Sequence, residues 1–175
     1  MGPQNIFRGI DWYRRGVAAR RRRQPSVSHV SAISGVAWAT DLIRLEIAVW
    51  DRVDARLREF HELPLAFFEP LLFVSRAPRG SLRVGDLAHA LRVTVGGTSK
   101  LVDRIERAGL IARELDPDDR RVSRLVLTKA GTRKLAAALK TYETEAGSIL
   151  GDVLRPAEQR EMSDYVSRLL TWIGP

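Results

Sequence analysis

The sequence predicts a mostly α-helical protein that carries one small β element. Two apolar stripes with helical spacing follow each other closely over residues 83–91 and 94–108. Two short runs with strand character come next, at 110–115 and 122–127, and a turn-forming segment rich in aspartate and arginine separates them. Helix, tight turn, helix and hairpin in this order make a winged helix-turn-helix. The flanking N- and C-terminal segments are predicted to be helices that form a dimerisation layer.

Residues 35–62 are predicted to form a long amphipathic dimerisation helix. Between Ala37 and Phe60 the apolar side chains advance by three or four residues. This stripe would be roughly 36 Å long at 1.5 Å per residue, so we expect it to meet a second copy of the chain. The next helix, over 65–77, is nearly all apolar and contains Pro70, which either kinks it or ends a short helix there.

The helix-turn-helix is predicted over residues 83–108. In its first helix Asp86 sits in the first turn, where the helix dipole favours a carboxylate. After a break at Arg92 and Val93, Thr94 can cap the second helix, which Gly109 ends. An apolar face of this helix is predicted to be buried. The opposite face carries hydroxyl and basic side chains near its start, namely Thr98, Ser99, Lys100 and Arg104.

A short, basic helix face of this kind fits the major groove of DNA, which admits one helix and is lined by hydrogen-bond donors and acceptors. The predicted wing, residues 110–127, has DPDDRR at its tip. Arg120 and Arg121 are therefore expected to reach backbone phosphates or the minor groove.

The distribution of charge supports this interpretation. The net charge is +8, and residues 79–134 contain thirteen lysines and arginines against seven acidic residues. Residues 31–78 and 135–175 each contain two more acidic than basic residues. The positive charge of the folded part therefore lies on the winged segment, where attraction to phosphates would use it.

Residues 1–34 are predicted to be a basic, flexible N-terminal arm. Residues 1–30 contain seven arginines and one aspartate and have no sustained apolar period. Two interpretations stay open: an arm that adds non-specific affinity for DNA, and a solvated leader or misplaced start codon. We assign no site residues to it.

Residues 128–175 are predicted to complete the dimerisation layer. Thr128 opens one helix, and Pro156 suits the first turn of the last helix. Both helices have an apolar side that a monomer would expose, so a stable monomer is not expected. A twofold axis would then place two second helices of the helix-turn-helix on half-sites about 34 Å apart.

At these residues the chain resembles the MarR family of bacterial transcriptional regulators. The resemblance rests on LAHALRVTVGGTSKLVDRIERAGLI, DPDDRR and LTKAG in the family's order and spacing. It extends from about Trp38 to about Ile173 and implies a winged helix-turn-helix domain over 35–175, with the DNA-binding unit at 65–127. It also implies that Asp119 braces the tip of the wing.

The resemblance implies that residues 94–108 form the recognition helix. Two departures from the family pattern stand out: Arg92 replaces a turn glycine, and Gly96 and Gly97 replace small hydroxyl residues. A glycine inside a helix costs roughly 1 kcal/mol relative to alanine, so the helix either begins loosely or allows close approach to phosphate. The predicted DNA-binding residues are Thr94, Gly97, Thr98, Ser99, Lys100, Arg104, Arg120 and Arg121.

Relatives often bind aromatic acids between the dimer helices and the winged unit. By resemblance, a small aromatic or phenolic effector would contact Trp38, Arg44, Trp50 and His61. The alternative is that the tryptophans belong to the dimer core and that His61 only ends a helix. Asp86 and His89 have the spacing of two metal ligands, but further ligands are missing nearby, so we predict no metal or other cofactor.

Other classes of protein are disfavoured. The chain has no cysteine and no apolar run of about 20 residues, so we expect a cytoplasmic protein without disulfides or membrane spans. It has neither a secretion signal nor a recognisable catalytic set, so we expect no enzyme. The expected function is a homodimeric regulator, and more specifically a repressor, that binds a pseudo-palindromic operator in double-stranded DNA. The alternatives are an enzyme that uses a dimer-interface cavity and a protein-interaction module that has lost specific DNA binding.

Overall fold

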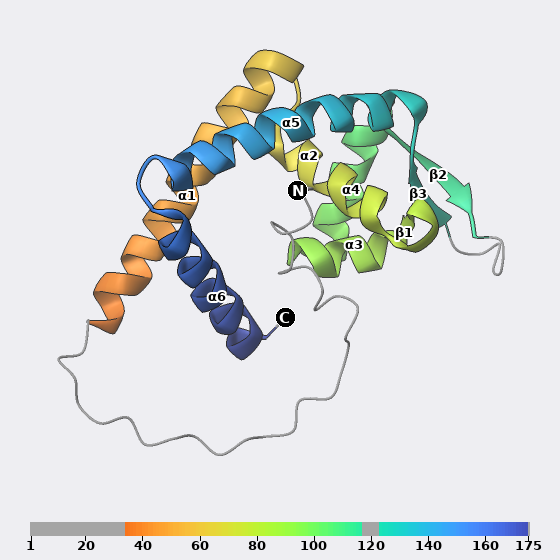
Figure 1. The fold of residues 1–175 in the computed structure, drawn as a ribbon. Coiled ribbons are helices and arrows are strands. Elements are labelled where there is room, and N and C mark those ends of the chain that lie inside the picture. The colour runs from red at the N-terminus through yellow and green to blue at the C-terminus, as the bar shows by residue number, and fades with distance from the viewer. Residues whose placement is uncertain (1–33, 117–122, 175) are drawn as a thin grey trace.

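The computed structural model describes residues 34–116 and 123–174 (Figure 1). The predicted arm therefore lies outside the described residues except for Ser34, which caps the first helix by accepting a hydrogen bond from the Ala37 backbone N–H at 3.4 Å. The elements in chain order are α1 (Gly35–His61), α2 (Leu65–Arg76), the short 3₁₀ turn η2 (Pro78–Gly80), β1 (Ser81–Arg83), α3 (Val84–Leu91), α4 (Val95–Arg107), β2 (Ile111–Leu115), β3 (Ser123–Leu127), α5 (Lys129–Gly151) and α6 (Pro156–Ile173).

The predicted fold, mostly helical with a winged helix-turn-helix, is confirmed. Figure 1 shows α3 and α4 beside the small sheet at one end of the molecule and α1 and α6 at the other. The long helix α5 runs between these two ends and lies along α1. Helices α3 and α4 and the small sheet therefore form one unit, here called the head, which α5 connects to the long helices α1 and α6.

The sheet has three antiparallel strands in the order β1, β3, β2. Leu82 of β1 pairs with Leu125 of β3, and Ile111 of β2 pairs with Leu127. The sequence predicted only the two-stranded hairpin, because three residues before a helix are too few to show an alternating pattern. The extra strand places Leu82 and Leu125 in the core, where both are buried.

Helix α2 lies at the centre of the core. It supplies the fully buried side chains of Phe68, Leu71 and Val74, which belong to one cluster with buried residues of α3, α4 and β3. Pro70 lies inside this helix and is buried, and the helix continues to Arg76. The helix therefore does not end at the proline, which was one of the two expectations.

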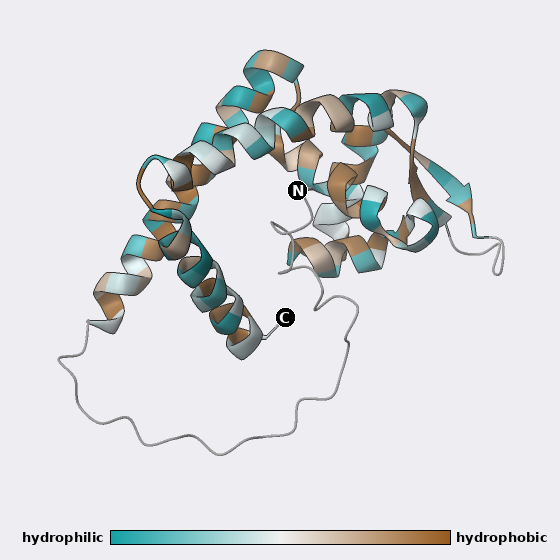
Figure 2. Ribbon diagram, in the orientation of Figure 1, coloured by the Kyte–Doolittle hydropathy of each residue, from teal (hydrophilic) through white to brown (hydrophobic). Residues whose placement is uncertain are grey.

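The long helices expose much apolar surface. Only Val53 and Leu57 of α1 are buried, and no described residue of α6 is. Figure 2 shows hydrophobic residues along both helices. The exposed large apolar side chains of these two helices are Val36, Trp38, Leu42, Ile43, Leu45, Ile47, Trp50, Phe60, Tyr165, Val166, Leu169, Leu170, Trp172 and Ile173.

Among the described residues, no helix has the length and apolar character needed to cross a membrane.

Candidate nucleic-acid interface

The turn between α3 and α4 is tight and is stabilised by hydrogen bonds. Arg92 adopts a left-handed backbone with φ of 56°, and its N–H donates to carbonyls in the last turn of α3. Thr94 then caps α4, because its hydroxyl accepts a hydrogen bond from the Gly97 backbone N–H at 3.1 Å. The predicted cap is confirmed. Residues other than glycine adopt the left-handed conformation less readily, so Arg92 stands at a position whose backbone glycine would suit better.

Helix α4 packs inward through Thr98, Val102 and Ile105, each fully buried. The Thr98 hydroxyl donates to the Thr94 backbone carbonyl at 3.0 Å. The prediction that Thr98 lies on the exposed polar face of the helix is wrong. The threonine shares the inner face with Val102, four residues later, and its hydroxyl is satisfied by the preceding turn. It is therefore not available to a groove.

The other predicted residues of α4 lie at or near the surface. Thr94, Gly97 and Lys100 are exposed, and Ser99 is half-buried. The guanidinium carbon of Arg104 lies 5.4 Å from the centre of the Phe67 ring of α2. A cation over an aromatic face at this distance is held in place, so the arginine is exposed yet oriented.

Two carboxylates of α4 bind one arginine of the wing. The Arg113 guanidinium of β2 donates to Asp103 at 2.5 Å and also contacts Glu106, whose carboxylate accepts from the Arg113 backbone N–H as well. Hydrogen bonding to Asp103 raises the pKa of Arg113 above its ordinary value. These contacts fix α4 against the wing, and they neutralise two acidic groups of α4.

The base of the wing is braced by a buried carboxylate. Asp116 is 1% exposed and accepts hydrogen bonds from Arg83 at 3.2 Å and Arg124 at 2.7 Å. Arg124 also donates to the Ser81 hydroxyl at 3.2 Å. The sequence analysis assigned the bracing role to Asp119, which lies outside the described residues together with Arg120 and Arg121. The three aspartates of the segment look alike in sequence, and the pairing register was needed to single out Asp116.

The wing is joined to α5 by a close backbone contact. A Cβ atom on Gly131 would lie 2.0 Å from the Leu110 carbonyl oxygen. The Thr128 hydroxyl donates to the Gly109 carbonyl at 2.6 Å and accepts from the Gly131 backbone N–H at 2.9 Å. The glycine of the LTKAG segment is therefore required by the approach of α5 to Leu110, just past the end of α4.

The predicted effector residues do not lie together. Trp50 lines a cavity of about 540 Å³ between α1, α2 and the end of α3. His61 instead makes a 2.7 Å hydrogen bond with Thr141 of α5, and Arg44 lies 3.8 Å from Asp41 on the exposed side of α1. Trp38 is near the start of α1 and does not line the cavity. Within one chain these four residues therefore do not line a common cavity, because α1 carries them to different turns and faces.

The cavity beside Trp50 contains two carboxylates in apolar surroundings. Glu46 and Glu69 line it, and burial raises the pKa of the Glu69 carboxyl, with the charge of Glu46 raising it further. The remaining lining is largely apolar, with Val49, Phe73 and Tyr142, and also includes the cationic Arg92. The sequence analysis missed this pair, because one glutamate lies on each of two helices.

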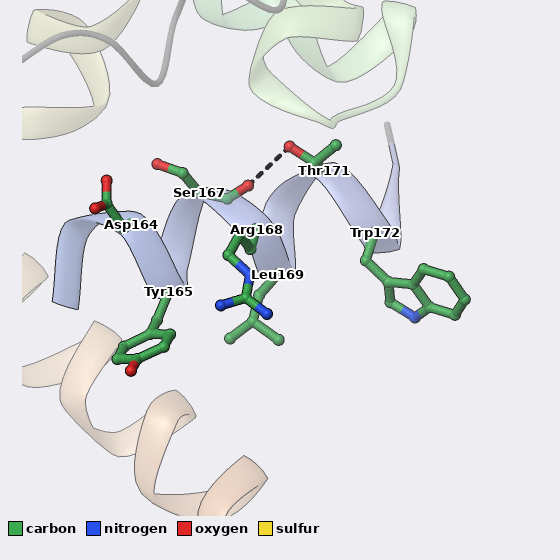
Figure 3. A pocket seen from close by; sticks show the side chains of 7 residues that line it. All are labelled: Asp164, Tyr165, Ser167, Arg168, Leu169, Thr171 and Trp172. Atoms are coloured by element: carbon green, nitrogen blue, oxygen red, sulfur yellow. Dashed lines mark hydrogen bonds between the residues drawn. The ribbon is translucent and has the colours of Figure 1, made fainter. Parts of the chain in front are cut away.

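A second hollow lies along α6 and is open to solvent. Figure 3 shows Tyr165 directed from α6 toward a neighbouring helix, while Trp172 projects at the end of α6. The lining consists of Asp164, Tyr165, Ser167, Arg168, Leu169, Thr171 and Trp172. Several of these side chains belong to the exposed apolar surface described above.

A model of the MarR family matches residues 70–122, which contain the helix-turn-helix and part of the wing. An uncharacterised HTH-type transcriptional regulator of Bacillus subtilis, YcgE, is 45% identical over 42 residues, or 24% of this chain and 27% of that protein. A similar regulator of Bacillus cereus is 31% identical over 84 residues, or 48% of this chain and 55% of that protein. The chain thus spans between about a quarter and just over half of the length of these relatives.

Solved structures share the fold over most of the chain. Sco3205, a MarR family regulator of Streptomyces coelicolor solved in complex with DNA, has a TM-score of 0.72 at 23% identity and covers 85% of this chain and 93% of its own. MepR of S. aureus, also solved with DNA, has a TM-score of 0.69 at 21% identity, covering 77% and 96%. A mutant MarR of E. coli with operator DNA has a TM-score of 0.64 at 19% identity, covering 79% and 99%.

Proposed function

We propose that this chain, which belongs to the MarR family of transcriptional regulators through its winged unit, binds a specific sequence in double-stranded DNA as a homodimer. The observation that carries the proposal is the construction of α4. Its inner face is fully buried at Thr98, Val102 and Ile105, while Lys100 and Arg104 remain exposed. A helix held from behind with its cations outward is suited to a major groove.

The described residues suggest how the contacts are divided. Lys100 and Arg104 would bind phosphate or a guanine edge, and Phe67 would hold the guanidinium of Arg104 in position. Thr94, Gly97 and Ser99 lie at the start of α4, the part of a recognition helix that contacts bases. Arg120 and Arg121 would grip the flanking backbone, and Asp116 would hold the wing for them.

The exposed apolar surface of α1 and α6 supports a homodimer. Large apolar side chains recur along both helices, and a monomer would leave them in water. The open hollow along α6 is suited to a helix of a second copy, since its lining includes Tyr165, Leu169 and Trp172. Two copies related by a twofold axis would read a pseudo-palindromic operator.

We further propose repression and release by a small effector. A dimer on its operator excludes other proteins from that DNA. The effector site would be the cavity beside Trp50. Its lining carries two carboxylates, Glu46 and Glu69, against one cation, Arg92, and this balance favours an uncharged aromatic or phenolic compound over an aromatic acid. Such a compound releases DNA only if it binds the released arrangement of the two heads more tightly than the DNA-bound one.

Selection of bound duplexes from random DNA, followed by fluorescence anisotropy on the selected sequence, tests the proposal. The expected result is a pseudo-palindromic site whose complex resists a large excess of random duplex. Lys100→Ala and Arg120→Ala should each weaken binding and lower the slope of log affinity against log salt by about one. Equal binding of selected and random duplexes would instead favour a protein-interaction module.

Effector binding and the enzyme alternative need a separate measurement. Phenol and benzoate are added to the complex with the selected duplex, and anisotropy and product analysis are followed together. Release by phenol at a concentration where benzoate has no effect supports the effector class. Turnover of either compound would favour the enzyme alternative.

A further inference from the structure

The first turn of α4 exposes apolar side chains beside bare backbone. Val95 is the first residue of the helix and is 56% exposed, and Val93 in the preceding turn is 52% exposed. Among the described residues, neither belongs to the hydrophobic core nor to the apolar side chains packed against it. Leu91 at the end of α3 and Leu101 within α4, by contrast, pack on that core.

Position 95 lies just beyond the core. It is seven residues before the fully buried Val102, so the two side chains share one side of α4. The buried core does not extend to the first turn of α4, however, so the side chain of Val95 is exposed at the start of the helix. Burial in this chain does not account for an apolar residue at this point.

The fold does not require a β-branched residue there either. Valine has a lower helix propensity than alanine, and the cap of α4 is made by Thr94 rather than by its neighbour. A polar residue would suit an exposed first turn equally well. A ligand that binds at the start of the helix would account for the apolar side chain.

The backbone beside Val95 is open to close approach. Gly96 is exposed, and a Cβ atom built on it would meet no atom of the described chain within 4 Å. Gly97 is exposed as well. A ligand can therefore reach Val95 from the glycine side without meeting another side chain in the first turn of α4.

A DNA major groove presents one apolar group on its floor, the C5 methyl of thymine, and apolar side chains read thymine by contacting it. The first residues of a recognition helix are those that approach base edges. The basic residues of α4, Lys100, Arg104 and Arg107, lie at least one turn further along the helix. Apolar contact at the first turn and charged contact further along would together distinguish the bases.

We propose that Val95 is a specificity-determining residue that recognises a thymine in each half-site through contact with the C5 methyl group. This inference rests on the proposed function, because it requires α4 to lie in the major groove. It adds a base identity to that function. Gly96 allows the contact by leaving the approach to the base edge open.

The test replaces thymine by deoxyuridine, which removes only the methyl group, at each thymine of the selected duplex in turn. The full-length protein should bind about fourfold more weakly at one thymine per half-site, as expected for the loss of one buried methyl. Val95→Ala should bind the thymine and uridine duplexes equally at that position. Alanine at an exposed first turn favours the helix, so the variant is expected to fold.

Val93→Ala is the matched control, since Val93 is exposed to a similar degree but precedes the helix. It should keep the fourfold preference for thymine. A duplex without any methyl-sensitive thymine, or a sensitivity that persists in Val95→Ala, overturns the inference while leaving DNA binding intact. Failure to select any preferred duplex overturns the proposed function and this inference together.

Discussion

The Arg92 guanidinium donates a hydrogen bond to the Gly174 carbonyl oxygen at 2.9 Å, and so joins the turn of the helix-turn-helix to the end of α6. The same residue lines the cavity beside Trp50. Arg92 thus belongs to the turn between α3 and α4, contacts the end of α6 and lines the cavity. A glycine at this position would fit the left-handed backbone but could not make the contact.

Arg92→Gly should raise the free energy of unfolding by up to about 1 kcal/mol, because glycine adopts the left-handed backbone without strain. Arg92→Ala keeps the strain and loses the contact, so it should not stabilise. Urea denaturation measures both. Faster amide hydrogen exchange at the end of α6 in both variants is the expected sign of the lost link, and unchanged exchange would show that the link contributes nothing.

Gly131→Ala should destabilise the protein by roughly 1–3 kcal/mol, because the added methyl group would collide with the Leu110 carbonyl. Gly147→Ala on the same helix is the matched control, since a Cβ atom there meets nothing within 4 Å. It should stabilise by about 0.5–1 kcal/mol. Thermal denaturation of both variants checks the pair, and equal effects would contradict the packing described for Gly131.

Gly96→Ala should separate stability from DNA binding. The added methyl group has room within the chain, so stability should rise by about 0.5–1 kcal/mol. Affinity for the selected duplex should fall, because the methyl group occupies space that the groove needs. Gly97→Ala should not stabilise equally, since its Cβ would lie 3.1 Å from the capping hydroxyl of Thr94. Unchanged affinity in Gly96→Ala would favour a helix that merely begins loosely.

Glu69→Gln should increase stability at neutral pH. Burial, followed by the charge of Glu46, raises the pKa of Glu69 in the folded state, so the folded protein binds this proton more tightly than the unfolded chain. That stabilisation is complete below the unfolded pKa of about 4.3 and is lost as the pH rises through the folded value. The melting temperatures of variant and wild type should therefore converge in acid and diverge near neutral pH. A constant difference would contradict the assignment.

Leu170→Asp should weaken self-association at least about tenfold, because the carboxylate would be buried without a partner in a dimer. Leu170 is 44% exposed on α6. Leu115→Asp, at a 66% exposed leucine on the wing, is the matched control and should leave association unchanged. Sedimentation equilibrium distinguishes the two variants, and a monomeric wild type would reject the proposed dimer.

Local signals in the sequence predicted the helices well. Thr94 and Thr128 both cap helices as expected, and Pro156 begins α6. Each of these residues acts within one helical turn, so its effect depends only on neighbours in sequence. The same locality applies to Gly109, which was predicted to end the helix: it directly follows Ala108, the C-cap of α4, and has a φ of 70°.

Features that depend on distant pairing were not predicted. Strand β1 exists because β3 lies beside it, and Asp116 is a brace because Arg83 and Arg124 are brought to it from two strands. Thr98 was misplaced because a hydroxyl that bonds to the preceding turn is compatible with burial. The pair of Glu46 and Glu69 requires two helices to pack, which no spacing within either helix reveals.

Ser81 of β1 pairs with Val126 of β3, so the chain enters and leaves the part of the molecule that contains α3, α4 and the wing at adjacent positions. The residues between these two positions therefore form one structural unit. The buried carboxylate of Asp116 stabilises the two ends of this unit by accepting hydrogen bonds from Arg83 of β1 and Arg124 of β3. A movement of the long helices therefore reaches this unit through its two adjacent chain ends, through the close contact of Gly131 with Leu110 and through the hydrogen bond of Arg92 with Gly174. The unit should rotate as a rigid body, with α4 and the wing keeping their mutual geometry. A signal would then change the angle between this unit and the long helices rather than the shape of the unit.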